Sequence, residues 1–231
     1  MKTIGLIGGM SWESTQTYYR LVNQGVKEAL GGLHSAKVIL YSVDFAEIEA
    51  LQRQGDWEAT AKILAAAGRA LEAAGAHFMV LCTNTMHKVA PQIERAVSIP
   101  LLHIADATAR ALQDNGVSRV GLLGTRFTME QAFYRDRLEA QGIEVIVPEE
   151  SQRVQIHSVI FDELCQGEIK SESKSAYLSV IDSLVDRGVQ GVVLGCTEIS
   201  LLVADGDTSV PLYDTTAIHA AQALRHALAK D

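Results

Sequence analysis

The sequence is poor in the features that mark several large classes of protein. Cysteine occurs only three times, at positions 82, 165 and 196, and there is no CxxC pair and no cluster of His and Cys. Three widely spaced thiols cannot all pair, and they offer neither a disulfide framework nor a structural zinc site. We therefore expect each thiol to be buried or catalytic, and we predict no bound metal.

Basic charge is also scarce, since 20 Lys and Arg face 28 Asp and Glu for a formal charge of -8. Nucleic acid and anionic lipid are bound by clustered Lys and Arg, so neither is expected as a partner. The opening segment MKTIGLIGGM has a short apolar run that Gly8 and Gly9 interrupt, which fits neither a signal peptide nor a spanning helix. We expect a cytoplasmic protein with no membrane contact.

Phosphate-binding glycine motifs are missing as well. The segment GLIGGMS lacks the GxGxxG spacing, and GxxxxGK[ST] occurs nowhere in the chain. The glycines near the N-terminus are therefore interpreted as a tight turn that follows a strand and lines a pocket.

The chain does contain short apolar runs that alternate with Ala- and Leu-rich amphipathic segments. The runs that read as strands are 3–9, 36–43, 77–82, 119–124 and 191–196. Alternation of this kind is typical of βαβ units and of a parallel sheet. It predicts the α/β class.

The sequence also repeats itself. IGLIGG resembles VGLLGT, Leu-Cys-Thr resembles Gly-Cys-Thr, and SIPLLHIADATA resembles SVPLYDTTAIHA, in the same order in both halves. A repeated order predicts two structurally similar units. We predict two pseudo-symmetric lobes, each a parallel sheet flanked by helices: residues 1–98 plus 212–231 with Cys82, and residues 99–211 with Cys196. Ligands bind beyond the carboxyl ends of parallel strands, so the active site is expected in the cleft between the lobes.

The two equivalent cysteines suggest a chemistry. Each is followed by Thr, which suits a helix N-cap, and a helix N-terminus favours a thiolate and can hold a substrate carboxylate. Inversion of a carbon centre needs one group to remove a proton from one face and another to deliver a proton to the opposite face. Cys82 and Cys196 meet that requirement as a matched pair.

With these motifs in order, the chain resembles the aspartate/glutamate racemases of the Asp/Glu/hydantoin racemase superfamily. The similarity covers the IGLIGGM start, the LCTNT motif and the GCTE motif, and it is strongest to the enterobacterial branch of broad-specificity amino-acid racemases. The resemblance implies a homodimer that racemises amino acids without pyridoxal phosphate or any other cofactor, with Cys82 and Cys196 as catalytic residues. It also implies a set of substrate-binding residues: Met10, Gln52, Thr83, Asn84, Thr85, Thr197 and Glu198.

The substrate itself is left open at this stage. Aspartate-specific members have basic residues where this chain has Glu49 and Cys165, although Arg53 could reach in from one turn away. Aspartate or glutamate is preferred over a broader set of amino acids. The alternative is an enzyme of the same superfamily that resembles a maleate isomerase or a decarboxylase and acts on a small dicarboxylate.

Overall fold

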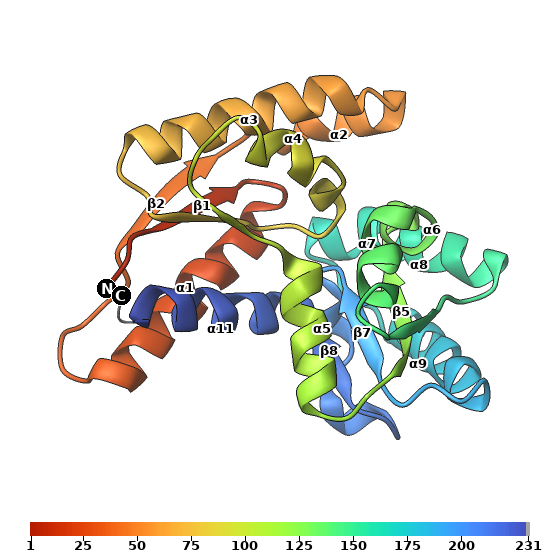
Figure 1. Cartoon of the computed structure of the whole chain (residues 1–231). Helices are drawn as coiled ribbons and strands as arrows, with labels where there is room; N and C mark the ends of the chain where they lie inside the picture. Colours follow the sequence, from red (N-terminus) through yellow and green to blue (C-terminus); the bar gives the residue numbers. More distant parts are fainter. Residues whose placement is uncertain (230–231) are drawn as a thin grey trace. The chain divides into compact units, whose positions relative to one another are not determined.

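The computed structural model describes residues 1–229 and divides the chain into two compact units, coloured by sequence in Figure 1. Unit 1 comprises Met1–Ile104 together with the chain from His219 onward, and unit 2 comprises Ala105–Ile218. These boundaries lie a few residues after the predicted 98/99 and 211/212. The reason is that the strands directly after Pro100 and Pro211 pair with the strands that precede them in the same sheet.

Unit 1 is built on a four-stranded parallel sheet in the order β2-β1-β3-β4. Its strands are β1 (Ile4–Gly8), β2 (Val38–Ser42), β3 (Phe78–Leu81) and β4 (Leu101–Leu102). Its helices are α1 (Trp12–Leu30), α2 (Phe45–Gln54), α3 (Trp57–Ala73), the 3-10 helix η1 (Thr85–Val89), α4 (Ala90–Glu94) and most of α11 (Thr215–Leu228). β1 and β3 are buried along their whole length, as strands covered on both faces must be.

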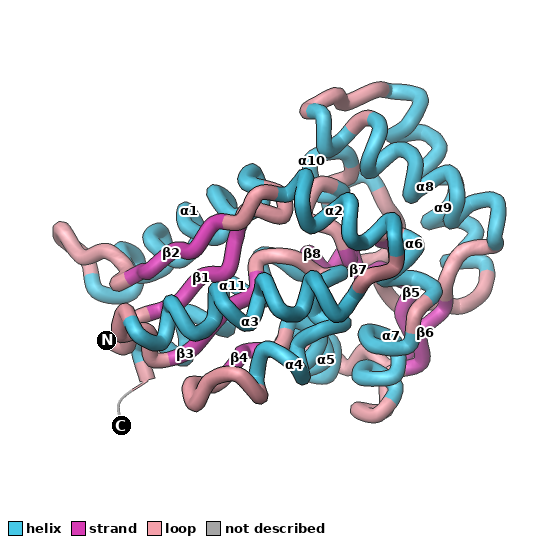
Figure 2. The backbone as a smooth tube through the Cα atoms, turned by 90° about the horizontal axis from the view of Figure 1, so that it is seen from above, coloured by secondary structure: helices cyan, strands magenta, loops and turns pink. Residues whose placement is uncertain are grey.

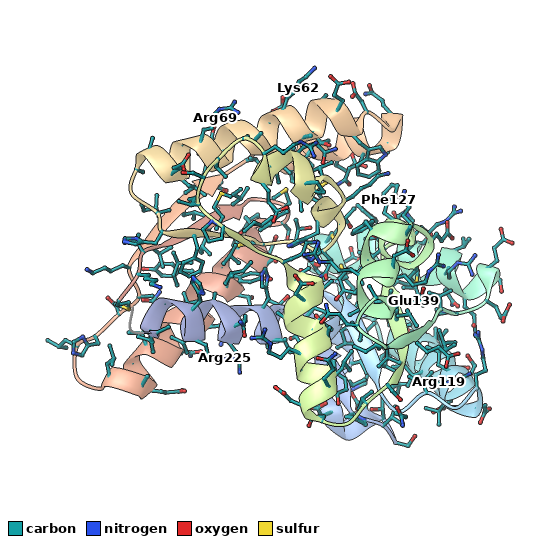
Figure 3. All side chains as sticks on the ribbon, viewed as in Figure 1. Lys62, Arg69, Arg119, Phe127, Glu139 and Arg225 are labelled. Atoms are coloured by element: carbon teal, nitrogen blue, oxygen red, sulfur yellow. The ribbon has the colours of Figure 1, made fainter. Side chains whose placement is uncertain are left out.

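Two separate apolar clusters cover the two faces of this sheet. Alternate residues of β3 divide between them: Met79 and Leu81 pack with α2, α3 and α4, while Phe78 and Val80 pack with α1 and α11. Figure 2 shows α3 lying over the sheet, and Figure 3 shows Lys62 and Arg69 of α3 pointing away from it. The alternation places the side chain that follows Leu81, the Cys82 thiol, on the α1 and α11 face.

Unit 2 repeats this topology with the strand order β6-β5-β7-β8, again all parallel. Its strands are β5 (Arg119–Gly124), β6 (Glu144–Ile146), β7 (Val192–Gly195) and β8 (Leu212–Asp214). Its helices are α5 (Ile104–Asp114), α6 (Arg126–Glu130), α7 (Ala132–Glu139), α8 (Glu150–Asp162), η2 (Leu164–Gln166), α9 (Ser171–Asp186), α10 (Ile199–Leu202) and η3 (Asp205–Asp207). The predicted α/β class with two parallel sheets flanked by helices is confirmed.

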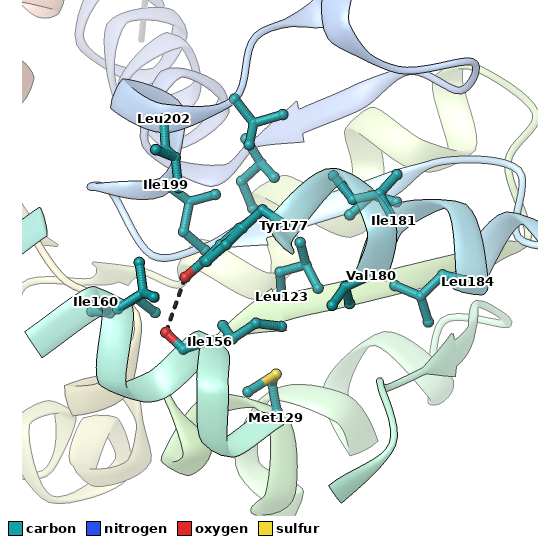
Figure 4. Packing of buried hydrophobic residues seen from close by; sticks show 14 of the residues in the cluster. Leu123, Met129, Ile156, Ile160, Tyr177, Val180, Ile181, Leu184, Ile199 and Leu202 are labelled. Carbon is teal, nitrogen blue, oxygen red and sulfur yellow. Dashed lines mark hydrogen bonds between the residues drawn. The ribbon is translucent and has the colours of Figure 1, made fainter. Parts of the chain in front are cut away.

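The core of unit 2 lies between β5, β7 and the helices α8 and α9. Figure 4 shows Tyr177 of α9 reaching across it, with its hydroxyl donating a 3.0 Å hydrogen bond to the backbone carbonyl of Ile156 on α8. A buried phenol needs such a partner, because an unpaired hydroxyl in an apolar core is costly. The bond fixes α9 against α8 within this core.

A fully buried histidine ties α11 to the rest of unit 1. His219 Nε2 donates to the carbonyl of Leu102 on β4, and His219 Nδ1 accepts from the hydroxyl of Tyr18 on α1, each at 2.8 Å. Burial lowers the pKa of His219 to about 4. The ring is therefore neutral in the folded protein at pH 7.

The shifted pKa of His219 makes the stability of unit 1 sensitive to acid. Because the folded pKa lies below the unfolded value of about 6.5, the contribution is present above pH 6.5 and is lost as the pH falls toward 4. Between pH 7 and pH 5 the free energy of unfolding should fall by about 2 kcal/mol more in the wild type than in His219→Gln. Urea unfolding of both proteins at both pH values measures the difference, and equal losses would contradict the assignment.

No helix within residues 1–229 combines the length and the apolar character that crossing a membrane would take.

Candidate active site

The two predicted catalytic cysteines occupy equivalent places in the two units. Cys82 directly follows β3 and Cys196 directly follows β7, and each of these strands is the third in its sheet order. Both cysteines therefore stand at the carboxyl ends of buried parallel strands, the edge at which open α/β sheets bind ligands. Each unit brings one thiol to such an edge.

Cys82 is enclosed by unit 1. Its side chain has no exposed surface, and its Sγ lies 4.0 Å from the carbonyl oxygen of Val80. The hydroxyl of Ser14, on the first turn of α1, donates a 3.1 Å hydrogen bond to the Cys82 carbonyl and fixes the backbone there. Burial raises the pKa of the Cys82 thiol well above its usual range, so the thiol is protonated.

This direction corrects the expectation that helix N-termini would favour the thiolates. The segment after Cys82 forms the 3-10 helix Thr85–Val89, and the segment after Cys196 forms a helix of four residues, Ile199–Leu202. Neither is a long α-helix with a strong dipole at the thiol, and desolvation outweighs what a short turn contributes.

The polar segment after Cys82 is held by a histidine. His87 Nδ1 donates to the carbonyl of Thr83 at 2.8 Å, and its Nε2 accepts from the backbone N–H of Ile104 at 3.2 Å. Asn84 and Thr85, which the sequence assigned to substrate binding, are buried beside it, whereas Thr83 is half-buried. Both ring nitrogens of His87 are thus engaged with backbone groups, and its role is to shape the loop.

Met10 and Gln52 come to the same part of unit 1. Met10 lies in the loop between β1 and α1 and packs in one cluster with Met86 of η1. The side-chain amide of Gln52, on α2, lies 2.9 Å from the Met86 sulfur and is buried. The structure therefore gathers Met10, Gln52 and the segment after Cys82, although they are far apart in the sequence.

The second thiol, in unit 2, has a charged neighbour. Cys196 Sγ lies 3.0 Å from Glu198 Oε2, and the hydroxyl of Thr197 donates to the same oxygen at 2.6 Å. Burial raises the pKa of Cys196 well above its usual range, and the charge of Glu198 and an electrostatic contribution from Cys165 raise it further. Cys165 itself, in η2, is half-buried against the core of unit 2, as expected for a packing residue.

Glu49 and Arg53 pair with each other on α2. Arg53 Nε lies 2.5 Å from Glu49 Oε1, and the Arg53 side chain is 76% exposed. The guanidinium is therefore bound to a neighbour one turn away and lies on the surface of unit 1. In the part of the chain that the structure describes, no group of three or more His, Cys, Asp and Glu side chains is arranged to hold a metal ion.

Sequence reasoning missed the roles of Ser14 and His219. Ser11 is the N-cap of α1, and its side chain accepts a hydrogen bond from the backbone N–H of Ser14. The local sequence pattern predicts this cap, but it does not predict a partner for the Ser14 hydroxyl. The contact of Ser14 with the Cys82 carbonyl joins residues 68 positions apart, and that of His219 with Tyr18 joins residues 201 apart. No local pattern encodes such pairs.

Comparison with known proteins adds independent evidence. Residues 7–223 match the Asp/Glu/Hydantoin racemase family. A solved Yersinia pestis protein classed with the Asp/Glu racemases is 59% identical, with 99% of this chain and 100% of that one covered and a TM-score of 0.94. An aspartate racemase homologue of Pyrococcus horikoshii is 37% identical over 98% and 99% of the two chains, with a TM-score of 0.86.

A curated relative, the broad specificity amino-acid racemase RacX of Bacillus subtilis, is 23% identical over 93% of each chain. The resemblance inferred from the LCTNT and GCTE motifs is confirmed, and the Yersinia match supports its enterobacterial part. The chain therefore belongs to the Asp/Glu/hydantoin racemase family, and its class of activity is that of a racemase, an isomerase.

Proposed function

We propose that the protein racemises aspartate, glutamate or a broader set of amino acids without pyridoxal phosphate, with Cys82 and Cys196 as its two acid–base groups. The observation that carries the proposal is the equivalence of the two thiols. Each follows the third strand of a sheet with the same topology, at the carboxyl end where ligands bind. Relatives named for aspartate and for broad amino-acid specificity support the substrate class.

The proposed reaction needs one thiolate and one thiol. The thiolate removes the α-proton from one face of the amino acid and becomes a thiol, while the opposing thiol gives its proton to the other face and becomes a thiolate. For the opposite enantiomer the roles reverse. An amino-acid α-proton is a very weak acid, so polar groups that stabilise the carbanion must contribute much of the rate acceleration.

The proposed substrate-binding groups lie in the segments that follow Cys82 and Cys196. We assign the substrate's carboxylate and amino group to the polar residues after the two cysteines, and the wall of the pocket to Met10 and Gln52. The polar residues are Thr83, Asn84, Thr85 and Thr197. Arg53 is already paired with Glu49 on the surface of unit 1, so this arginine gives no reason to prefer aspartate over a broader set of amino acids.

The decisive experiment needs no assumption about the substrate. Each amino acid is incubated with the protein in D2O, and α-deuteration is followed by NMR together with optical rotation. Deuteration with loss of rotation supports the proposal. Maleate isomerisation or malonate decarboxylation, with no exchange of any amino acid, would establish the alternative reaction of the superfamily instead.

We also propose that the protein acts in the cytoplasm, a reducing compartment that would keep its three cysteines as free thiols.

We further propose a homodimer formed through the exposed apolar surface of unit 1. The strand β2 is an edge strand, and Leu40 and Tyr41 on it are 47% and 41% exposed. Trp12 and Tyr19, two turns apart on the neighbouring helix α1, are 64% and 53% exposed. Edge strands that carry exposed apolar side chains are prone to pair with another chain, and a second copy offers a matching edge.

Replacing Tyr19 and Tyr41 with glutamate should convert the dimer to a monomer, because each charge would be buried in the interface. Light scattering coupled to gel filtration should show half the wild-type mass. Ile169→Glu, which places a charge at a 59%-exposed apolar site of unit 2, is the matched control and should leave the dimer intact. A wild-type protein that is already monomeric would refute the proposed interface.

A further inference from the structure

The environment of Cys196 differs from that of Cys82 in one respect that bears on acid–base chemistry. Glu198 places a carboxylate oxygen 3.0 Å from the Cys196 sulfur, and the residue is only 6% exposed. The Thr197 hydroxyl, which donates to the same oxygen, keeps the carboxylate oriented. At Cys82 the neighbouring acceptor is the neutral carbonyl of Val80, at 4.0 Å.

The charge of Glu198 makes Cys196 harder to ionise than Cys82. A carboxylate accepts a hydrogen bond from a thiol, but it repels a thiolate at the same distance, and the repulsion is strong where water is excluded. The pKa of Cys82 is raised by burial, whereas that of Cys196 is raised by burial and additionally by Glu198. The cost of ionising Cys196 therefore includes a contribution that Cys82 does not bear.

We propose that Glu198 is a positioning residue that holds Cys196 in its protonated form, so that Cys196 is the proton donor of the resting enzyme. The assignment replaces the sequence-based expectation that Glu198 binds substrate. Its consequence for catalysis rests on the proposed racemase function, but the protonation state of Cys196 does not.

The proton balance of a turnover shows what this arrangement does. When Cys82 takes the α-proton and Cys196 gives its own to the carbanion, the enzyme is left with a Cys196 thiolate beside the Glu198 carboxylate. Two adjacent anions disfavour this form, so water returns a proton to Cys196, and Cys82 must give its own proton to water before it can act as a base again. Of the two forms with a single thiolate, the one ionised at Cys82 is therefore the less costly, and it is the form that acts on the enantiomer whose α-proton faces Cys82.

The test measures the ionisation of Cys196 directly. The rate at which iodoacetamide alkylates Cys196 is followed against pH by peptide mass spectrometry in the wild type and in Glu198→Gln, which keeps the shape and the acceptor but removes the charge. The midpoint of the Cys196 profile should fall by about one pH unit, which at a fixed lower pH is about a tenfold faster alkylation. An unchanged or higher midpoint would overturn the proposal, and a higher one would identify Glu198 as a base for Cys196.

Two further variants isolate the charge. The other titratable groups that bear on Cys196 are Cys165 of η2 and Tyr177 of α9, so the series is made in a Cys165→Ser background. Glu198→Asp keeps the charge and should hold the midpoint nearer the wild-type value. Glu198→Ala also removes the charge, and it serves in place of the glutamine variant if that one does not fold. Glu163→Gln removes a carboxylate that faces Tyr177, and it should leave the Cys196 midpoint unchanged.

Failure of the racemase proposal would appear elsewhere. The racemase proposal fails if no amino acid exchanges its α-proton in D2O. The alkylation profile tests the role of Glu198 independently, because it can be measured in a protein that exchanges no amino acid.

Discussion

Replacement of either Cys82 or Cys196 with serine is expected to lower the rate of racemisation by about a thousandfold. General acid–base groups contribute typically 10²–10⁴-fold, and a serine hydroxyl is too weak an acid to replace a thiol as donor or a thiolate as base. Loss of optical rotation with the best substrate, measured for both variants and the wild type, gives the ratio directly.

Isotope exchange makes the same experiment sharper. In a two-base mechanism each variant keeps the base for only one enantiomer. Any residual α-deuteration by Cys82→Ser should therefore be confined to one hand of the substrate, and that by Cys196→Ser to the other. Deuteration of both enantiomers by one variant would show that a single group serves both faces, and the two-thiol mechanism would be wrong.

Cys165→Ser is the matched control, because Cys165 is a thiol of the same unit as Cys196 that packs against the core. It should retain activity within a few-fold. A loss as large as that of the other two variants would mean that Cys165 has a place in the reaction.

The fold was predictable because its signals are local and repeated. The apolar runs 77–82 and 191–196 correspond to β3 and β7, and the segments after Pro100 and Pro211 open the short strands β4 and β8 that lead into α5 and α11. A strand buried on both faces must be apolar along its whole length, and a duplicated order of such strands indicates a duplicated sheet. Both features can be recognised in short stretches of consecutive residues.

The surroundings of the thiols were not predictable in the same way. The pattern after Cys82 suggested one helix, but Pro91 lies in the first turn of α4 and lacks the backbone N–H that would continue a helix from the preceding turn. The chain therefore divides into η1 and α4. The pKa of each thiol then depends on how completely distant segments enclose it, and that enclosure is a property of the packed unit.

The contact of Glu198 with Cys196 shows that even a contact between near neighbours in the sequence is only partly predictable. Both residues belong to the GCTE motif and are two positions apart, so their proximity could be inferred from the sequence. Whether the carboxylate turns toward the thiol or toward a ligand depends on the backbone between them, and in the structure Thr197 and Cys196 both hydrogen-bond the same carboxylate oxygen.

The largest expected effect on stability comes from Gly9, in the loop that leads from β1 to Met10. Its φ of 95° lies in the region that favours glycine, and a Cβ there would collide with the backbone carbonyl oxygen of Val43. Its N–H also donates a 2.8 Å hydrogen bond to the hydroxyl of Thr15 on α1, so the loop cannot shift freely. Gly9→Ala should therefore destabilise unit 1 in two ways.

The size of the effect can be estimated and checked against a second glycine. The positive φ costs an alanine roughly 1–2 kcal/mol, and the forced displacement of packed backbone adds about 1–3 kcal/mol. Gly55 has a φ of 73°, and among the described residues other than its chain neighbours no heavy atom lies within 4 Å of the position that a Cβ would take there, so Gly55→Ala should lose only the first contribution. Urea unfolding should thus show Gly9→Ala to be the less stable variant by about 1–3 kcal/mol, and equal losses would mean that the contact with Val43 is relieved without cost.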